Sequence, residues 1–226
     1  MTLDDALSQL KALSDPGKAA EMAAYHKVDR PYLGTMVPEI DSLCKTWRAD
    51  LTLEDRLALC AALWDSNIHE ARIAAAKLLT QARIRPDDSA AWNLICAWVP
   101  QFDAWAIADT TCIAAQKRIT ADPSRLDKVE DWTHSPIMWQ RRAALVATLP
   151  FARLNNPKEH ELAARNRILG WAAGYLSDKD WFIQKAVAWW LRDLSKHDPA
   201  RTEAFLAEFG DLMKGWARKE AGQYLP

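Results

Sequence analysis

The chain has 226 residues, of which 50% are hydrophobic and 26% charged, so it can bury a sizeable core and disorder is excluded as its main state. With only 7 glycines against 11 prolines, the chain has too few flexible turn residues for a many-stranded sheet protein, and the prevalence of helix formers favours an all-α chain. The formal net charge of −1 does not indicate a nucleic-acid or membrane partner, so any such surface must be locally segregated. The chain also has 12 tryptophans, more than its 4 tyrosines and 5 phenylalanines together, and we expect some of the indoles to do more than fill the core.

The cysteines and the N-terminus predict the compartment. Cys44, Cys60, Cys96 and Cys112 form no C-x-x-C pair and lie in apolar helical contexts, which favours buried thiols in a reducing compartment over disulfides or a zinc site. The first five residues are acidic where a signal peptide is basic, and no apolar run approaches the ~18 residues of a membrane span. We therefore expect a cytoplasmic protein with no membrane association.

In chain order, the prolines separate segments of helical period. A polar helix over 3–13 opens the chain, Thr52–Asp55 resembles the capped start of a helix, and Ser177–Asp180 resembles the capped start of another. Polar helical sequence over 201–219 closes the chain. Polar helices at both ends suit a monomer.

Four segments resemble one another. Three begin with a large apolar residue, carry a base four positions later and continue into an alanine-rich turn; the fourth carries an aspartate at the basic position. They are Ile68–Ala75, Trp105–Cys112, Met138–Leu145 and Trp181–Ala188. The equivalent positions are 37, 33 and 43 residues apart, close to the ~40-residue helix-pair repeats that stack into a solenoid with a concave face.

The repeats align charged residues of both signs. Arg72, Arg142 and Lys185 would form a basic ridge along one side of the superhelix, and Asp109 interrupts it. One interpretation is that Asp109 merely pairs with neighbouring bases, which contributes about 0–1 kcal/mol when exposed. The other is that this carboxylate has a chemical role.

Two tryptophans lie near charged groups in helical register. Trp105 precedes Asp109 by four residues, which places an indole and a carboxylate on one helix face. Trp189 precedes Arg192 by three, and the same ridge could hold both pairs. Since Trp190 is adjacent to Trp189, one of the two should be buried and the other exposed, but helical geometry does not say which.

Indoles and a carboxylate together suit a cation, whereas the flanking bases suit an anion. DNA that carries an alkylated, positively charged base combines both. Cleavage of the N-glycosidic bond passes through a sugar with oxocarbenium character, which one carboxylate can stabilise while it positions a water. The cationic base is already a good leaving group, so no general acid is needed.

Several segments together resemble the AlkD family of DNA alkylation repair glycosylases between about residues 20 and 200. They are Tyr25–Lys27, Pro31–Gly34, Trp105 with Asp109, Ser135–Ala144 and Phe182–Arg192. The resemblance implies one domain over 1–226, a right-handed superhelical solenoid of HEAT-like repeats whose concave face binds duplex DNA. It also implies a monofunctional hydrolase that excises N3- and N7-alkylated purines without flipping the base.

The resemblance also implies roles for individual residues. Asp109 would be the catalytic carboxylate, and Trp105 and Trp189 would contact the deoxyribose of the lesion; Trp189 is favoured over Trp190 because it lies three residues before Arg192. A further group would contact DNA: Tyr25, Arg142 and Arg192 by resemblance, and Lys27, Arg72 and Lys185 from the predicted ridge.

Two alternatives remain. One is a non-catalytic relative that binds unusual or branched DNA, although the presence of Trp105, Asp109 and Trp189 argues against it. The other is a protein-interaction scaffold, a common role of helical solenoids that the near-neutral charge favours. For the enzyme we expect no metal and no cofactor, because the five histidines show no ligand spacing and no Gly-rich phosphate loop is present.

Overall fold

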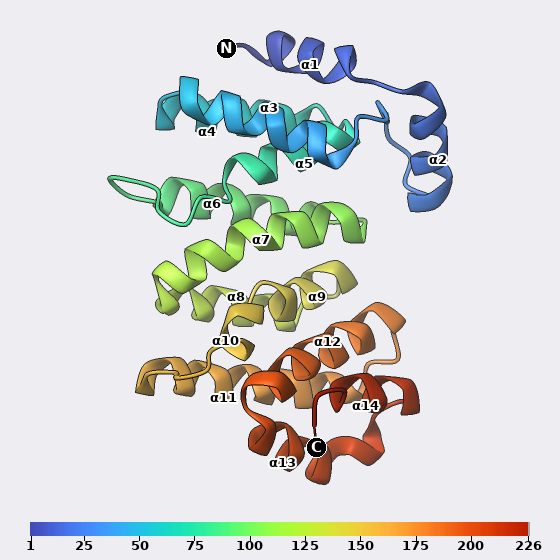
Figure 1. Ribbon diagram of the computed structural model, residues 1–226, viewed down its shortest axis with the longest axis vertical. Coiled ribbons are helices and arrows are strands. Elements are labelled where there is room, and N and C mark those ends of the chain that lie inside the picture. Colours follow the sequence, from blue (N-terminus) through green and yellow to red (C-terminus); the bar gives the residue numbers. More distant parts are fainter. Residues whose placement is uncertain (226) are drawn as a thin grey trace. The chain divides into compact units, whose positions relative to one another are not determined.

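A computed structural model describes residues 1–225. The regular structure of these residues is helical throughout, which confirms the all-α prediction (Figure 1). The chain divides into two compact units, Met1–Arg118 and the part from Ile119 onward, and each is described by itself. The single domain expected over 1–226 stays a prediction.

The first unit contains seven α-helices among the described residues. They are α1 (Leu3–Ala12), α2 (Pro16–His26), α3 (Val37–Asp50), α4 (Leu53–Asp65), α5 (His69–Leu78), α6 (Ser89–Trp98) and α7 (Trp105–Ala121), with a 3₁₀ turn over Val99–Gln101; α7 ends just beyond the unit boundary. The Thr52 hydroxyl accepts a hydrogen bond from Asp55 N at 3.1 Å, so the predicted cap of α4 is confirmed.

Helix α5 lies in the interior of this unit, and many of its buried side chains are small. Ala71, Ala74, Ala75 and Ala76 are fully buried, and α5 packs against α3 and α4. Alanine has no side-chain freedom to lose and allows neighbouring helices to approach closely. The alanine-rich part of this repeat segment therefore packs closely against both α3 and α4.

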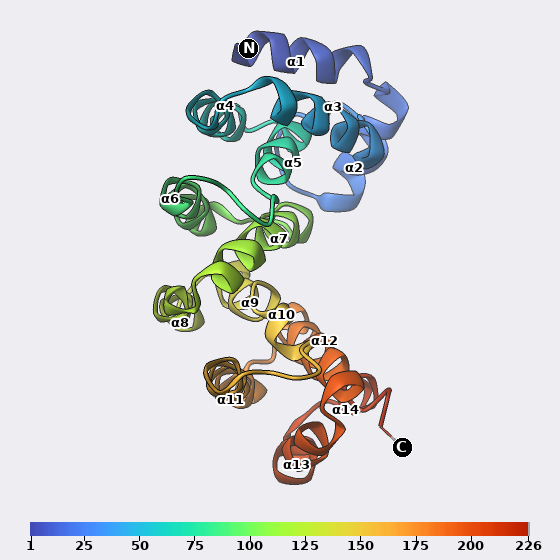
Figure 2. The ribbon, with the colours of Figure 1, turned by 60° about the vertical axis from the view of Figure 1, so that its left-hand side comes forward.

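The second unit is built around a long helix. Its elements are a 3₁₀ turn over Pro123–Arg125, α8 (Leu126–Thr133), α9 (Met138–Val146), α10 (Leu149–Ala152), α11 (Glu159–Gly174), a 3₁₀ turn over Tyr175–Ser177, α12 (Trp181–His197), α13 (Pro199–Phe209), a 3₁₀ turn over Gly210–Leu212 and α14 (Gly215–Ala221). Helix α12 packs against α9, α10, α13 and α14, and lies beside α14 in both views (Figure 2). Asp180 accepts from Phe182 N at 2.8 Å, which confirms the predicted cap of α12.

The four repeat segments each coincide with the start of a helix. Trp105, Met138 and Trp181 are the first residues of α7, α9 and α12, and Ile68 immediately precedes α5. The prediction that these segments are helical is thus confirmed, while their equivalence as repeats of a solenoid stays a prediction.

Tryptophans and cysteines differ in burial. Seven of the 12 tryptophans are buried, Trp105, Trp181 and Trp216 are exposed, and the other two are half-buried. All four cysteines are free thiols, but Cys96 is only half-buried, so the prediction of burial was wrong for that one. None of the helices within residues 1–225 is long and apolar enough to cross a membrane.

Candidate functional site

Two exposed aromatic rings meet in the first unit. Trp105, the first residue of α7, is 38% exposed, and Tyr25, in the last turn of α2, is 69% exposed. Their ring centroids are 6.2 Å apart and their planes perpendicular. Exposed aromatic faces in contact are unusual on a soluble surface, and such rings can receive a cationic or sugar-like ligand.

Three further rings, those of His26, His69 and Tyr32, are stacked next to Trp105. The His26 ring is 5.6 Å from Trp105 and 4.7 Å from His69, and His69 is 4.8 Å from Tyr32. The Nδ1 atoms of both histidines are buried without a hydrogen-bond partner. Burial, with smaller effects of the charges on His26 and Arg30, lowers the pKa of His69 to about 3. His69 is therefore uncharged at neutral pH.

This aromatic stack borders a cavity of about 170 Å³. His26, His69 and Trp105 line it together with Thr110, whose hydroxyl donates to the Ala106 carbonyl at 2.6 Å. The Trp105 side chain therefore lines a small, largely apolar cavity within the first unit. The sequence pattern does not single out His26 or His69, because neither stands at metal-ligand spacing and their stacking arises from tertiary packing.

The loop between α2 and α3 is fixed to the start of α7. Arg30, whose side chain is 1% exposed, forms an ion pair with Asp103, two residues before Trp105. Glu70 accepts hydrogen bonds from Leu33 N at 2.9 Å and Gly34 N at 2.8 Å. These contacts tie the loop to the first turns of α5 and α7 and so determine where Trp105 stands.

The predicted catalytic carboxylate lies on the same helix as Trp105. Asp109 is half-buried and one helical turn further along α7. An indole and a carboxylate therefore stand on one face of α7. Lys27 closes α2 in a left-handed conformation (φ 55°), and its side chain is exposed.

In the second unit, α12 presents three predicted residues on one face. Lys185, Trp189 and Arg192 follow at spacings of four and three residues. Trp189 is half-buried, whereas Trp190 is 0% exposed and its Nε1 donates to the Thr148 carbonyl at 3.4 Å. Trp190 therefore belongs to the core, whereas the Trp189 side chain is partly exposed to solvent.

A carboxylate that the sequence analysis missed joins the two cations. Glu220 of α14 accepts from Lys185 Nζ at 2.7 Å and from Arg192 Nη1 at 2.7 Å. The carboxylate side chain is 13% exposed, against 37% for Lys185 and 28% for Arg192. Lys185 and Arg192 therefore cover part of the Glu220 carboxylate from solvent. No local spacing could have predicted this, because Glu220 lies about 30 residues further along the chain.

Two members of the expected basic ridge are internal, which corrects the prediction that the ridge is exposed along its length. Arg72 is 8% exposed; its Nε donates to the Trp64 carbonyl at 3.1 Å, and its guanidinium lies 4.8 Å from the Trp64 ring. Arg142 is 5% exposed and donates to the Phe182 carbonyl at 2.9 Å. The Trp64 carbonyl is in the last turn of α4, where carbonyl groups lack partners within their own helix. Contacts of Arg72 and Arg142 with DNA stay predictions.

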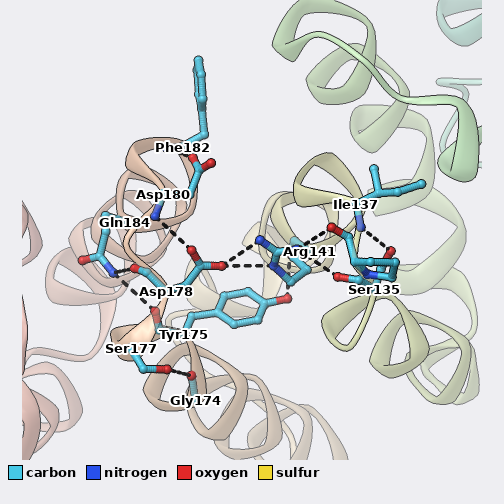
Figure 3. Close-up of polar contacts among 11 residues, drawn as sticks. Ser135, Ile137, Arg141, Gly174, Tyr175, Ser177, Asp178, Asp180, Phe182 and Gln184 are labelled. Atoms are coloured by element: carbon cyan, nitrogen blue, oxygen red, sulfur yellow. Dashed lines mark hydrogen bonds and ion pairs between the residues drawn. The ribbon is translucent and has the colours of Figure 1, made fainter.

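Arg141, the neighbour of Arg142, positions the start of α12 (Figure 3). Its Nε donates to Asp178 at 3.0 Å, and its Nη1 donates to the Ser135 carbonyl at 2.9 Å. The Tyr175 hydroxyl donates to the Arg141 carbonyl at 2.9 Å, and Asp178 in turn accepts from Asp180 N at 2.9 Å. The loop that leads into α12 is thus fixed to the first turn of α9.

A second pair of exposed indoles was also missed. Trp181 and Trp216 are 52% and 37% exposed and stack with centroids 5.9 Å apart. Lys185 Nζ lies 6.0 Å from the Trp216 ring centroid. Helical spacing from Lys185 could have singled out Trp181, but only the packing of α14 on α12 brings Trp216 to it.

The chain is thus an all-helical protein with an exposed indole on the same helix face as a carboxylate in its first unit and, separately, indoles beside cations in its second unit. Comparison with known families gives its class. Residues 6–225 match the sequence model of a family described as DNA alkylation repair enzyme, and the chain belongs to that family.

Solved structures share the fold. A predicted DNA alkylation repair enzyme from Enterococcus faecalis is 23% identical, with a TM-score of 0.76 over 94% of this chain and 96% of that one. AlkD2 from Streptococcus mutans is 18% identical (TM-score 0.64, 92% and 98% covered), and smu.31 from Streptococcus mutans UA159 is 19% identical (TM-score 0.64, 84% and 93% covered). No curated protein matched the chain.

Proposed function

We propose that this family member is a monofunctional DNA glycosylase that excises cationic N3- and N7-alkylated purines from duplex DNA without flipping the base. The observation that carries the proposal is the placement of Trp105 and Asp109 one turn apart on α7, with the exposed Tyr25 ring against Trp105. Membership of a DNA alkylation repair family supports DNA as the substrate.

The proposed reaction is hydrolysis of the N-glycosidic bond. The bond between C1′ and the purine breaks, its electron pair neutralises the cationic base, and the base leaves. The sugar that remains has oxocarbenium character, which the Asp109 carboxylate stabilises by its charge. A water held by Asp109 adds to C1′ and passes its proton to the carboxylate or to solvent. Each step balances without a metal or a cofactor.

The remaining residues have binding roles in this proposal. Trp105 and Trp189 contact the deoxyribose and offer ring faces to positive charge. Tyr25, Lys27 and Arg192 contact the DNA near the lesion.

The HEAT-like solenoid, with its right-handed superhelix and concave DNA-binding face, belongs to the same proposal. It is supported by the recurring helix starts of α5, α7, α9 and α12. Within that arrangement Lys185 would add a cation beside Arg192. Arg142, which the resemblance places near the lesion, and Arg72 would act mainly by supporting their helices, since both donate to main-chain carbonyl groups.

The test is release of methylated purine from methylated duplex DNA under single-turnover conditions. Asp109→Asn keeps the shape of the side chain and removes its charge, and we expect a loss of rate of about 10²-fold. Asp4→Asn, an exposed carboxylate on α1, is the matched control and should behave as wild type. A chelator should have no effect on the rate.

Two results would decide against this function. An Asp109→Asn protein as active as wild type would reject the catalytic role. If wild type released no base but bound DNA with strong salt dependence, the chain would be a non-catalytic DNA-binding relative. Absence of both release and binding would favour a protein-interaction scaffold.

A further inference from the structure

The second unit contains a cavity of about 430 Å³ of which the proposed function uses only one lining residue, Arg192. It lies where the last turns of α12 meet the end of α10 and the residues after α14, and its volume is within the range of about 300–1,000 Å³ typical of ligand sites. The charged and aromatic side chains that line it are Arg153, Arg192, Asp193, Lys196, His197 and Tyr224.

The charge of this lining is opposite to that of the whole chain. Arg153, Arg192 and Lys196 supply three cations to the lining, Asp193 is its one carboxylate, and Glu220, which does not line the cavity, also pairs with Arg192 at 2.7 Å. Three cations thus face two carboxylates and the excess positive charge lies on Lys196, whereas the full sequence has a net charge of −1. Asp193 accepts from Arg153 Nε and Nη2, both at 2.7 Å, and its other oxygen lies 3.6 Å from Arg192 Nη2. The cavity is therefore a place where positive charge is locally segregated.

Lys196 is the cation best placed to receive a ligand. Its side chain is exposed and its ammonium lies 5.5 Å from the Tyr224 ring centroid. No carboxylate of the described residues lies within ion-pair distance of this ammonium. An anion that entered the cavity would thus gain an ion pair without displacing an acid from Lys196.

The end of α12 explains only part of the positive charge around this cavity. Lys196 and His197 lie in the last turn of α12, where positive charge is favoured by the helix dipole. Arg153 comes from another element, directly after α10, and Arg192 lies one turn earlier. Cations from separate elements that converge on one cavity are the arrangement that binds phosphate groups.

The register of α12 relates the cavity to DNA. Trp189, Arg192 and Lys196 follow at spacings of three and four residues, so they form one face of the helix. We infer that the Arg153–Arg192–Lys196 cavity binds a backbone phosphate of the DNA strand that runs past Trp189. The inference rests on DNA as the ligand in the proposed function and not on base excision.

Binding to undamaged duplex DNA tests this site separately from catalysis. Fluorescence anisotropy measures the binding constant at several salt concentrations for wild type, Lys196→Gln and Lys128→Gln. Lys128 on α8 pairs with Asp131 at 3.1 Å, so its replacement is a control with the same change in charge. Both lysines are exposed, and neither substitution threatens the fold.

Loss of one phosphate contact has a defined signature. For Lys196→Gln we expect weaker binding and a slope of log K against log salt that is shallower by about 0.9, whereas Lys128→Gln keeps the wild-type slope. Equal slopes for the two variants would overturn the inference. So would a wild-type protein that does not bind undamaged duplex at low salt, whatever the outcome of the base-release assay.

Inorganic phosphate distinguishes the two sources of the anion. If free phosphate raises the unfolding temperature of wild type more than that of Lys196→Gln, while the duplex slopes are equal, the cavity serves a free phosphate compound and the DNA assignment is wrong. If the duplex slope changes, the DNA backbone is the source. Retained base release by a protein with equal slopes would leave the glycosylase proposal intact while this one failed.

Discussion

Replacing the adjacent tryptophans of α12 one at a time should separate stability from function. Trp190 is 0% exposed, and its indole N–H donates to the Thr148 carbonyl at 3.4 Å. A tryptophan buries about 150–250 Å², which at about 25 cal/mol per Å² corresponds to roughly 4–6 kcal/mol. Core Trp→Ala substitutions cost about 3–5 kcal/mol, so we expect Trp190→Ala to lose about 4 kcal/mol.

Replacing the neighbouring Trp189 should lower the free energy of unfolding less and the rate of base release more. Trp189 is partly exposed and Trp190 is not, so Trp189→Ala removes less buried area and should cost about 3 kcal/mol, less than Trp190→Ala. Because Trp189 is proposed to contact the deoxyribose of the lesion, the rate of base release should fall in this variant. Trp190→Phe, which keeps a ring in the core, should retain both the rate and most of the stability.

The assays are denaturant unfolding for the free energy and single-turnover base release at a temperature where every variant is folded. Domains of this kind are stable by about 5–15 kcal/mol, so a loss of 4 kcal/mol is readily measured. Equal losses of stability for Trp189→Ala and Trp190→Ala would refute the assignment of core and surface. A Trp189→Ala protein with the wild-type rate would refute the contact with the lesion.

Further predictions concern His69 and Gly34 of the first unit and Gly170 of the second. Because burial lowers the pKa of His69 to about 3, the unfolded chain binds a proton below about pH 6.5 that the folded chain does not. The free energy of unfolding should therefore fall on acidification, by up to about 1.4 kcal/mol per pH unit, and His69→Phe should flatten this dependence between pH 5 and 6.5; an unchanged slope would contradict the burial argument. Gly34→Ala should cost at least about 2 kcal/mol, since Gly34 has φ +78° and a Cβ there would overlap the Asp15 carbonyl. Gly170→Ala, in open space on α11, should instead stabilise the protein by about 0.5–1 kcal/mol in thermal unfolding, and equal effects of the two would refute this reasoning.

The helix starts were predictable because their signals are local. The apolar residue that opens each repeat segment stands at or just before the start of α5, α7, α9 and α12. Thr52 and Asp180 cap their helices through hydrogen bonds that span three and two residues. Such contacts depend on neighbouring residues alone, and the sequence displays them directly.

The partners of the basic side chains could not be predicted from the local sequence. Arg72 and Lys185 occupy equivalent positions of the repeat, yet Arg72 is buried against Trp64 while Lys185 reaches Glu220. Each outcome depends on which group the helix packed alongside offers, a carbonyl group of α4 in one place and a carboxylate of α14 in the other. A repeat pattern predicts the position of a cation on its helix but not its partner.

This difference bears on how a near-neutral chain could bind DNA. Within residues 1–225 seven arginines are buried, and Glu70 is the buried carboxylate, so the exposed surface carries more negative charge than the net value of −1 suggests. Extended contact with phosphates would then be unfavourable over most of the surface. Binding would depend on the few places where cations gather, such as the α12 face with Lys185 and Arg192 and the cavity at its end. A protein of this kind should bind undamaged DNA weakly, and the positive charge of an alkylated base would contribute a large share of its preference for the lesion.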